Sequence, residues 1–305
     1  MKPNFPKCDL FILSAVTDLS FLKFTVPHQV KQCKVNGRRI LRVDTSPVSG
    51  YYKNHRELSK LSKLKDLGNN LLNEGLIDEV VQIDYNREVV NSAYRRHFDK
   101  NLPETHCFRG YPYYGSILPF EISDYEYIAH LDSDMLIYQK EGFDWIQEAI
   151  EIMEANQDII CCLPLSGPPL SKGQLHQGTT EYKFDNKRDI YLFKNFTSRI
   201  FVMNTERFAS LLPMKIDWLS WREPIKSKLL GNGKMLCWEV SVSSAIQKSN
   251  FYRADIANKF AWSLHPPERG ERFNSMIPEL ISKIESGWFP RKQAGHYDLN
   301  LDWWI

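Results

Sequence analysis

Residues 125–137 read YEYIAHLDSDMLI, a run of apolar residues that Asp132 and Asp134 interrupt. Residues 127–131, just before the acids, predict a buried β-strand. Two carboxylates in such a run are costly unless a partner neutralises them. A divalent cation would do so, and carboxylate oxygens suit Mg²⁺ and Mn²⁺, which usually complete their shell with phosphate and water. The alternative is a pair of acids that only caps the loop after the strand.

Strand-like and helix-like segments alternate through the first half of the chain. We expect strands over residues 10–15, 39–43, 79–83 and 127–131, and helices over residues 21–33, 57–72 and 87–98, with Pro27 near the first turn of its helix. This alternation predicts an α/β fold with parallel pairing and a doubly wound sheet. Ligands of such sheets bind beyond the carboxyl ends of the strands, which is where Asp44, Asp132 and Asp134 lie.

The second half is less regular. We expect helices over residues 143–155, 237–247 and 275–285, and strands over residues 159–163, 199–203 and 251–254. Between them, residues 166–189 form a polar stretch that contains Gly and Pro, and a loop of that length in a compact domain is usually functional or disordered.

Composition limits the protein class. The chain has 305 residues, 43% hydrophobic and 25% charged, which suits one large α/β domain. Its net charge of +2 and the absence of basic blocks argue against a nucleic-acid partner. The six cysteines include no Cys-x-x-Cys pair, and no apolar run approaches the roughly 20 residues of a membrane-spanning helix. We therefore expect reduced thiols and a cytoplasmic protein.

The pair Asp132-Ser133-Asp134 at a strand end, near the middle of the chain, resembles the metal and nucleotide site of GT-A glycosyltransferases. These enzymes transfer a sugar from a nucleotide donor. The resemblance covers about residues 9–267 and implies a Rossmann-like, mixed but mostly parallel sheet flanked by helices, with acceptor-side loops and helices in the C-terminal half. It implies one catalytic domain over residues 1–305. Residues 9–140 or so would bind the nucleotide sugar, and residues 141–305 would form the acceptor-binding and catalytic half with its aromatic tail.

The resemblance also implies a metal site. His265 follows Asp134 by 131 residues, in the Pro-containing run AWSLHPP, and would join Asp132 and Asp134 at one Mn²⁺ (or Mg²⁺) beside the donor diphosphate. The alternative for His265 is a packed or capping histidine.

Several residues are expected to contact the donor. Arg269 and Arg272, three positions apart, could clamp the diphosphate, although a solvated Glu/Arg turn would look the same. Thr17 and Asp44, which follow the first two strands, would hold the nucleotide base. Arg109, in an aromatic turn, and Ser133, between the two acids, complete the expected donor contacts.

The catalytic carboxylate is expected at Glu239, which opens a helical segment 105 residues after Asp134. It could equally be an acid that the helix dipole favours in a first turn, and Asp185, Asp189 and Asp217 are rivals. No Glu-Asp pair follows Trp238, as it does in the largest inverting family, so a retaining reaction is favoured over an inverting one.

The expected function is a metal-dependent hexosyltransferase that uses a nucleotide sugar, with UDP as the favoured nucleotide. The acceptor would be a glycan, a lipid-linked glycan or a small molecule. The alternatives are a non-catalytic sugar-nucleotide or glycan-binding protein of the same fold, and a sugar-phosphate nucleotidyltransferase. The tryptophans of the C-terminal segment usually pack in the core, although they could also stack on a sugar. Trp288, Trp303 and Trp304 could instead give peripheral contact with the inner face of the membrane.

Overall fold

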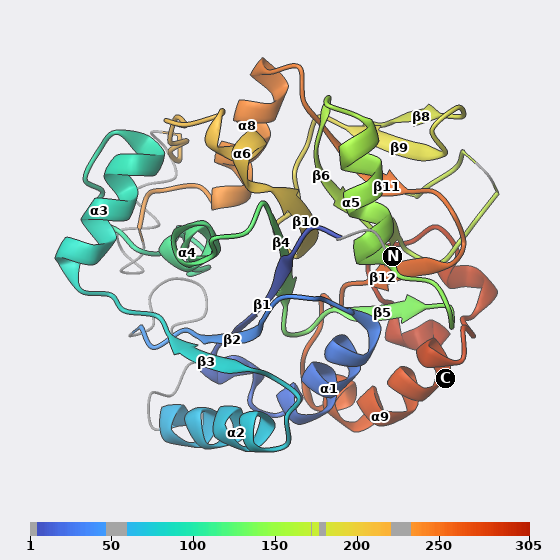
Figure 1. The fold of residues 1–305 in the computed structure, drawn as a ribbon. Helices are drawn as coiled ribbons and strands as arrows, with labels where there is room; N and C mark the ends of the chain where they lie inside the picture. The colour runs from blue at the N-terminus through green and yellow to red at the C-terminus, as the bar shows by residue number, and fades with distance from the viewer. Residues whose placement is uncertain (1–4, 47–59, 172, 177–180, 221–232) are drawn as a thin grey trace.

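The computed structural model describes residues 5–46, 60–171, 173–176, 181–220 and 233–305, in which a large mixed sheet is flanked by helices (Figure 1). The strands of this sheet run in the order β3-β2-β1-β4-β10-β6-β11-β9-β8. Their bounds are β1 Cys8–Ser14, β2 Arg39–Val43, β3 Glu79–Gln82, β4 Tyr127–Asp132, β6 Ile159–Leu163, β8 Lys183–Asp185, β9 Ile190–Phe193, β10 Ile200–Asn204 and β11 Tyr252–Ile256. The α/β class and the large flanked sheet are as expected from the sequence.

The N-terminal half of the sheet follows the predicted pattern. Strands β3, β2, β1 and β4 pair in parallel, and β1 and β4 are almost entirely buried, because apolar runs of this kind need cover on both faces. The helices of this half are α1 (Leu22–Gln32), α2 (Leu61–Asn73), α3 (Arg87–Phe98) and α4 (Tyr114–Ile122). Residues 57–59 of the expected second helix lie outside the described residues, and α4 was not foreseen.

Two details of the helices differ from expectation. Pro27 lies inside α1 rather than near its first turn, because the helix begins at Leu22. The C-terminal helix α9 (Glu271–Glu285) begins earlier than the predicted residue 275 and takes in Arg272. The other helices of the second half are α5 (Trp145–Ala155), α6 (Thr205–Ala209) and α8 (Trp238–Lys248).

The expectation of mostly parallel pairing is wrong for the other half of the sheet. Strand β10 runs antiparallel to both β4 and β6, and β9 runs antiparallel to both β11 and β8; only β6 and β11 pair in parallel there. In Figure 1 the strands β8 and β9 lie at the end of the sheet farthest from β3. Since β10 is antiparallel to β4, it begins beside the end of β4, with Ile200 opposite Leu131.

A second, smaller sheet brings distant segments together. Its strands are β5 (Leu136–Gln139), β12 (Ala261–Leu264) and β7 (Leu165–Ser166), in the order β5-β12-β7. Strand β5 starts two residues after Asp134, and Leu264 pairs with Leu136. His265, which follows β12, is therefore carried to the end of the Asp-Ser-Asp turn.

The aromatic C-terminal tail packs inside the protein. A separate cluster of buried side chains joins β12, α9 and the tail, and it includes Trp262, Phe273 and Trp304. Trp304 is only 1% exposed, and its indole N–H donates to Gln293 Oε1 at 3.0 Å. Of the three tryptophans considered for membrane contact, Trp304 is thus a core residue, whereas Trp288 is 48% exposed. None of the helices in the described part of the chain is long and apolar enough to cross a membrane.

Candidate functional site

The strand register gathers the predicted site at one edge of the large sheet. Ser14 at the end of β1 lies opposite Val43 of β2, and Leu13 lies opposite Asp132 of β4. The amide of Asp44 donates to the Ser14 carbonyl at 2.8 Å, and the amide of Ser133 donates to the Leu13 carbonyl at 3.0 Å. The loops that follow these three strands therefore share one edge, as expected for the carboxyl ends of parallel strands.

A cavity of about 780 Å³ opens at this edge, and nine of the ten residues singled out from the sequence line it. These are Thr17, Asp44, Arg109, Asp132, Ser133, Asp134, Glu239, His265 and Arg269. The volume falls within the range of about 300–1,000 Å³ typical of ligand pockets. The tenth residue, Arg272, does not line the cavity; its guanidinium pairs with Asp302 at 2.6 Å, and both side chains are largely exposed. Arg269 and Arg272 therefore do not act together, because only Arg269 faces the site.

Asp44 reaches the cavity wall in a different way from the one expected. Its carboxylate has no exposed surface. It accepts from the Tyr85 hydroxyl at 2.9 Å and the Ser46 amide at 3.0 Å, and it lies 3.2 Å from His106 Nε2. The side chain is thus fully used in contacts with Ser46, Tyr85 and His106, and the backbone of Asp44 is the part that can line the cavity.

Asp134 is a buried carboxylate in the cavity wall. It is 3% exposed, and its Oδ2 accepts from Arg269 Nη1 at 2.6 Å. Its other oxygen, Oδ1, is buried and has no hydrogen-bond partner among the described residues. Buried carboxylate oxygens are rarely left without a partner, so an oxygen of this kind needs an explanation such as an absent ion.

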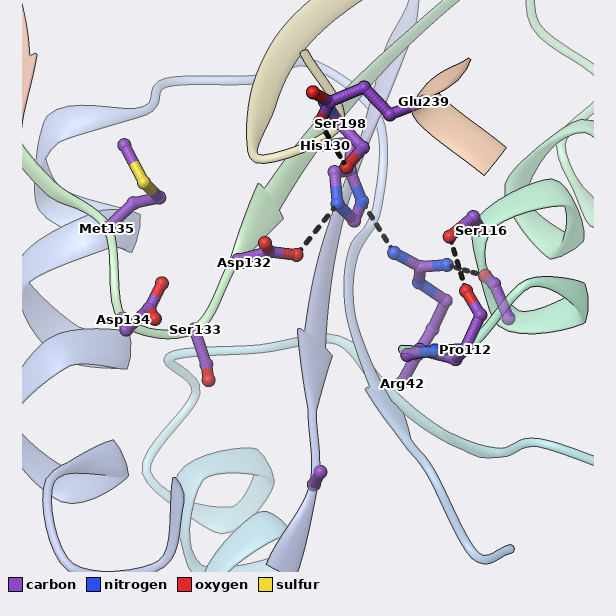
Figure 2. A network of polar contacts seen from close by, with 12 residues as sticks. Arg42, Pro112, Ser116, His130, Asp132, Ser133, Asp134, Met135, Ser198 and Glu239 are labelled. Carbon is purple, nitrogen blue, oxygen red and sulfur yellow. Dashed lines mark hydrogen bonds and ion pairs between the residues drawn. The ribbon is translucent and has the colours of Figure 1, made fainter. Parts of the chain in front are cut away.

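Asp132 is held by a buried relay that Figure 2 shows from Arg42 through His130 to Asp132. Arg42 is fully buried, and its guanidinium donates to the Gly115 carbonyl and, at 2.5 Å, to His130 Nδ1. Because arginine can only donate, His130 Nδ1 must be the acceptor, and the proton of a neutral ring sits on Nε2. That N–H faces Asp132 Oδ1 at 3.3 Å and fixes the orientation of the carboxylate.

The two groups of this relay have shifted pKa values. Burial and the neighbouring Arg42 lower the pKa of His130 well below its usual range, which keeps the ring neutral. The Asp132 side chain lines the cavity and is 35% exposed, and desolvation raises its pKa to about 6. Arg199, Arg269 and His265 act against that rise. A carboxylate with such a pKa gains from a nearby cation.

His265 is oriented as a metal-binding histidine would be. Its Nδ1 lies 2.8 Å from Asp298 Oδ1, and hydrogen bonding to His265 lowers the pKa of Asp298. The ring is 7% exposed and lines the cavity. A carboxylate on one ring nitrogen, which leaves the other nitrogen free to bind, is the usual arrangement around metal-ligating histidines.

The side chains at this edge suit a cation that takes only part of its ligands from the protein. Within the described residues, no three His, Cys, Asp or Glu side chains are already arranged to hold a metal ion. Mg²⁺ and Mn²⁺ commonly bind through one or two carboxylates, with phosphate and water supplying the rest. Asp134 Oδ1, which has no partner among the described residues, and the desolvated Asp132 match that chemistry, and the Arg269 guanidinium is the cation that pairs with Asp134.

Two charged residues at the site were missed from the sequence. Asp18 lines the cavity and accepts from the Ser133 hydroxyl and the Ala15 amide, both at 2.9 Å. Arg199 lies beside Asp132, whose amide donates to the Arg199 carbonyl at 2.7 Å. Burial alone would lower the pKa of Arg199, but Tyr297 and the nearby acids Glu239, Asp132 and Asp134 outweigh it and raise that pKa. Arg199 comes just before β10, and β10 begins beside the end of β4 because the two strands are antiparallel. The sequence predicts the strand but not its direction, so it does not show that Arg199 lies next to Asp132.

Glu239 stands where two cavities meet. It lies in the first turn of α8 (Figure 2), and its Oε2 accepts from the Ser198 amide at 3.1 Å and the Ser198 hydroxyl at 3.2 Å. A second cavity of about 460 Å³ lies on the other side, and Glu239, Arg199 and Val240 line both. The rival acids Asp185, Asp189 and Asp217 line neither of the two cavities.

Comparison with known proteins adds no family to this picture. A scan against protein-family models and a search of the curated proteins both find no match to the chain. The geometry of the two cavities is therefore what bears on the function of the chain.

Proposed function

We propose that the protein is a metal-dependent glycosyltransferase that moves a hexose-type sugar from a nucleotide donor, with UDP-sugars favoured, to an acceptor hydroxyl. The observation that carries the proposal is the convergence of Asp132, Asp134 and His265 on one cavity. That cavity meets a second one at a carboxylate, Glu239. A two-substrate transfer needs such a pair of adjoining sites with an acid or base between them.

The larger cavity has the chemistry of a donor site. Asp132, Asp134 and His265 would hold Mn²⁺ or Mg²⁺, which when bound neutralises charge on the diphosphate. Arg269 and Arg199 line the same wall and can donate to phosphate oxygens, and arginine suits this role because its guanidinium pairs with two oxygens at once. Thr17, Ser133, Arg109 and the backbone of Asp44 remain for the sugar, ribose and base.

The transfer itself breaks the bond between the anomeric carbon and the diphosphate oxygen and forms a bond from that carbon to the acceptor oxygen. The acceptor proton goes either to Glu239 or to the leaving phosphate. Glu239 is suited to the first route because Ser198 holds its Oε2 and leaves Oε1 to face a substrate. A retaining outcome stays favoured, on the sequence around Trp238. The second route, through the leaving phosphate, belongs to that outcome.

Donor hydrolysis tests this function without knowledge of the acceptor. Purified protein would be incubated with UDP-, GDP- and dTDP-sugars, with Mn²⁺ or with EDTA, and release of nucleoside diphosphate would be measured. We expect release from one donor, dependent on metal and lost in Asp134→Ala. The matched control is Asp66→Ala, an exposed acid on α2 outside both cavities. Equal release by Asp134→Ala and the unaltered protein would refute the assignment.

A further inference from the structure

The second cavity differs in chemistry from the first. It is lined by hydroxyl and amide side chains, two arginines, one acid and a few apolar groups: Ser166, Asn195, Phe196, Thr197, Arg199, Glu239, Val240, Ser243, Ser244, Gln247, Arg253 and Tyr297. Most pockets for drug-like ligands are mainly apolar, with few polar groups. A wall this polar suits a ligand that carries many hydroxyl groups.

Acidic side chains of the protein lie near both arginines of this wall. Arg253 makes a two-point pair with the buried Asp255, at 2.8 and 3.1 Å, so its charge is already neutralised. Arg199 makes no hydrogen bond or ion pair through its guanidinium within the described residues, but it lies in the field of Glu239, Asp132 and Asp134. An acidic ligand placed here would meet the Glu239 carboxylate, and like charges at close range are unfavourable.

Several amide and hydroxyl groups keep hydrogen-bonding capacity towards the cavity. Gln247 Nε2 donates to Asn195 Oδ1 at 2.8 Å, which leaves Gln247 Oε1 as an acceptor and the Asn195 amide nitrogen as a donor. The Ser243 hydroxyl accepts from the Phe196 amide at 2.9 Å and still has its own proton to give. Thr197 makes no side-chain hydrogen bond within the described part of the chain. Donors and acceptors side by side match sugar hydroxyls, which both give and accept.

We infer that this cavity binds the acceptor, and that the acceptor is a neutral carbohydrate unit rather than a sugar acid, a phosphate ester or a lipid tail. That the ligand serves as an acceptor rests on the proposed function. That the ligand is a neutral carbohydrate follows from the side chains of the cavity wall alone. The attacking hydroxyl would lie next to Glu239, since that residue is the carboxylate shared by the two cavities.

Equilibrium binding tests the ligand class directly. Methyl glycosides of glucose and galactose would be titrated beside the corresponding methyl uronosides, in the presence of UDP and Mn²⁺, and followed by saturation-transfer NMR and calorimetry. We expect at least one neutral glycoside to bind about tenfold more tightly than its uronic acid counterpart. An acid that binds as tightly as its neutral partner, or no binding by any neutral glycoside, would overturn the inference.

Substitutions locate the binding. Gln247→Trp and Thr197→Trp would fill the cavity from two different elements, and each is expected to weaken glycoside binding about tenfold or more. Lys248→Trp is the matched control, since it adds the same side chain to the next position of α8, which is exposed and does not line the cavity. Glycoside binding that survives both filling variants would place the ligand elsewhere.

Donor release by the unaltered protein separates the two hypotheses. If no donor is hydrolysed but a neutral glycoside still binds in this cavity, the proposed transferase function fails and the ligand class stands. If donor release is metal-dependent but only acidic glycosides bind, the function stands and the inference fails.

Discussion

Removing Arg269 should make the stability of the protein depend on metal. Arg269 Nη1 lies 2.6 Å from Asp134 Oδ2, and the Asp134 side chain is only 4% exposed, whereas that of Arg269 is 29% exposed. In Arg269→Gln the buried carboxylate loses its nearest cation, while its Oδ1 already has no partner within the described residues. A cation bound between Asp132 and Asp134 would then supply the missing charge.

The size of the effect follows from the burial of the pair. Removing one partner of a fully buried ion pair costs about 3–5 kcal/mol, and the partial exposure of Arg269 reduces this to about 2–3 kcal/mol. For a domain of this length, about 2 °C of Tm corresponds to 1 kcal/mol, so the variant should melt about 4–6 °C lower in EDTA. Mn²⁺ at a hundred times its Kd should return about 2.7 kcal/mol, or about 5 °C. The unaltered protein should gain less, because there the cation has to displace Arg269.

Thermal unfolding by calorimetry, in EDTA and across an Mn²⁺ titration, measures both shifts. Arg272→Gln is the matched control. It removes the same charge three positions further along the chain, in the first turn of α9, where Arg272 forms an exposed pair with Asp302. Its stability should change by less than about 0.5 kcal/mol, with an unaltered response to Mn²⁺. The reasoning is refuted if Arg269→Gln gains no more from Mn²⁺ than the unaltered protein does.

Three further predictions concern the contact between Arg42 and His130, the role of Glu239, and the stability of the protein at acidic pH. His130→Leu removes one of the two acceptors of the buried Arg42 guanidinium, which keeps only the Gly115 carbonyl, and should cost about 3 kcal/mol. Most of this loss should be recovered in the double variant with Arg42→Met. Denaturant unfolding of the unaltered protein, the two single variants and the double variant measures this, and additive losses would show that the two side chains are not coupled. Glu239→Gln should slow sugar transfer about 100-fold while UDP affinity stays within about threefold; an equal loss of UDP binding would assign Glu239 to the donor instead. The hydrogen bonds from His28 and Lys31 lower the pKa of Glu285 from 4.5 to about 2, so the stabilisation is complete above pH 4.5 and is lost as the pH falls from there towards 2. Between pH 4.5 and 2 the free energy of unfolding should fall by about 2 kcal/mol less in Glu285→Gln than in the unaltered protein. An equal fall in both proteins would contradict a lowered pKa of Glu285.

Local signals in the sequence predict which residues gather at the carboxyl edge of the large sheet. The apolar runs that form β1, β2 and β4 are short and bounded, and the acids follow them directly, so the edge occupied by Asp132 and Asp134 could be predicted. Thr17 and Ser133 follow from the same register because parallel strands end together. These predictions need no contact between distant segments beyond the sheet itself.

The remainder depends on long-range pairing that no local pattern shows. Strand β10 could be recognised as a strand, but its antiparallel direction decides that Arg199 lies beside Asp132. Strand β12 was not foreseen, and its register with β5 is what brings His265 to the acids. The sequence gives no reason to distinguish Arg269 from Arg272. Because α9 begins at Glu271, Arg269 precedes the helix and lines the cavity, whereas Arg272 lies on the helix and pairs with Asp302 at the surface. The sequence leaves Trp304 open as a buried residue or as a surface anchor, and its packing with α9 shows that it is buried.

Calorimetric titration of UDP into the protein, with Mn²⁺ or with EDTA, measures whether the larger cavity holds a nucleotide through a metal ion. If the larger cavity is a metal-dependent nucleotide-sugar site, UDP should bind in Mn²⁺, lose at least about tenfold in affinity in EDTA, and lose as much in Asp134→Ala, while Asp66→Ala binds normally. Binding that is unchanged by EDTA and by Asp134→Ala would contradict the account, because the carboxylate pair would then play no part in holding the nucleotide.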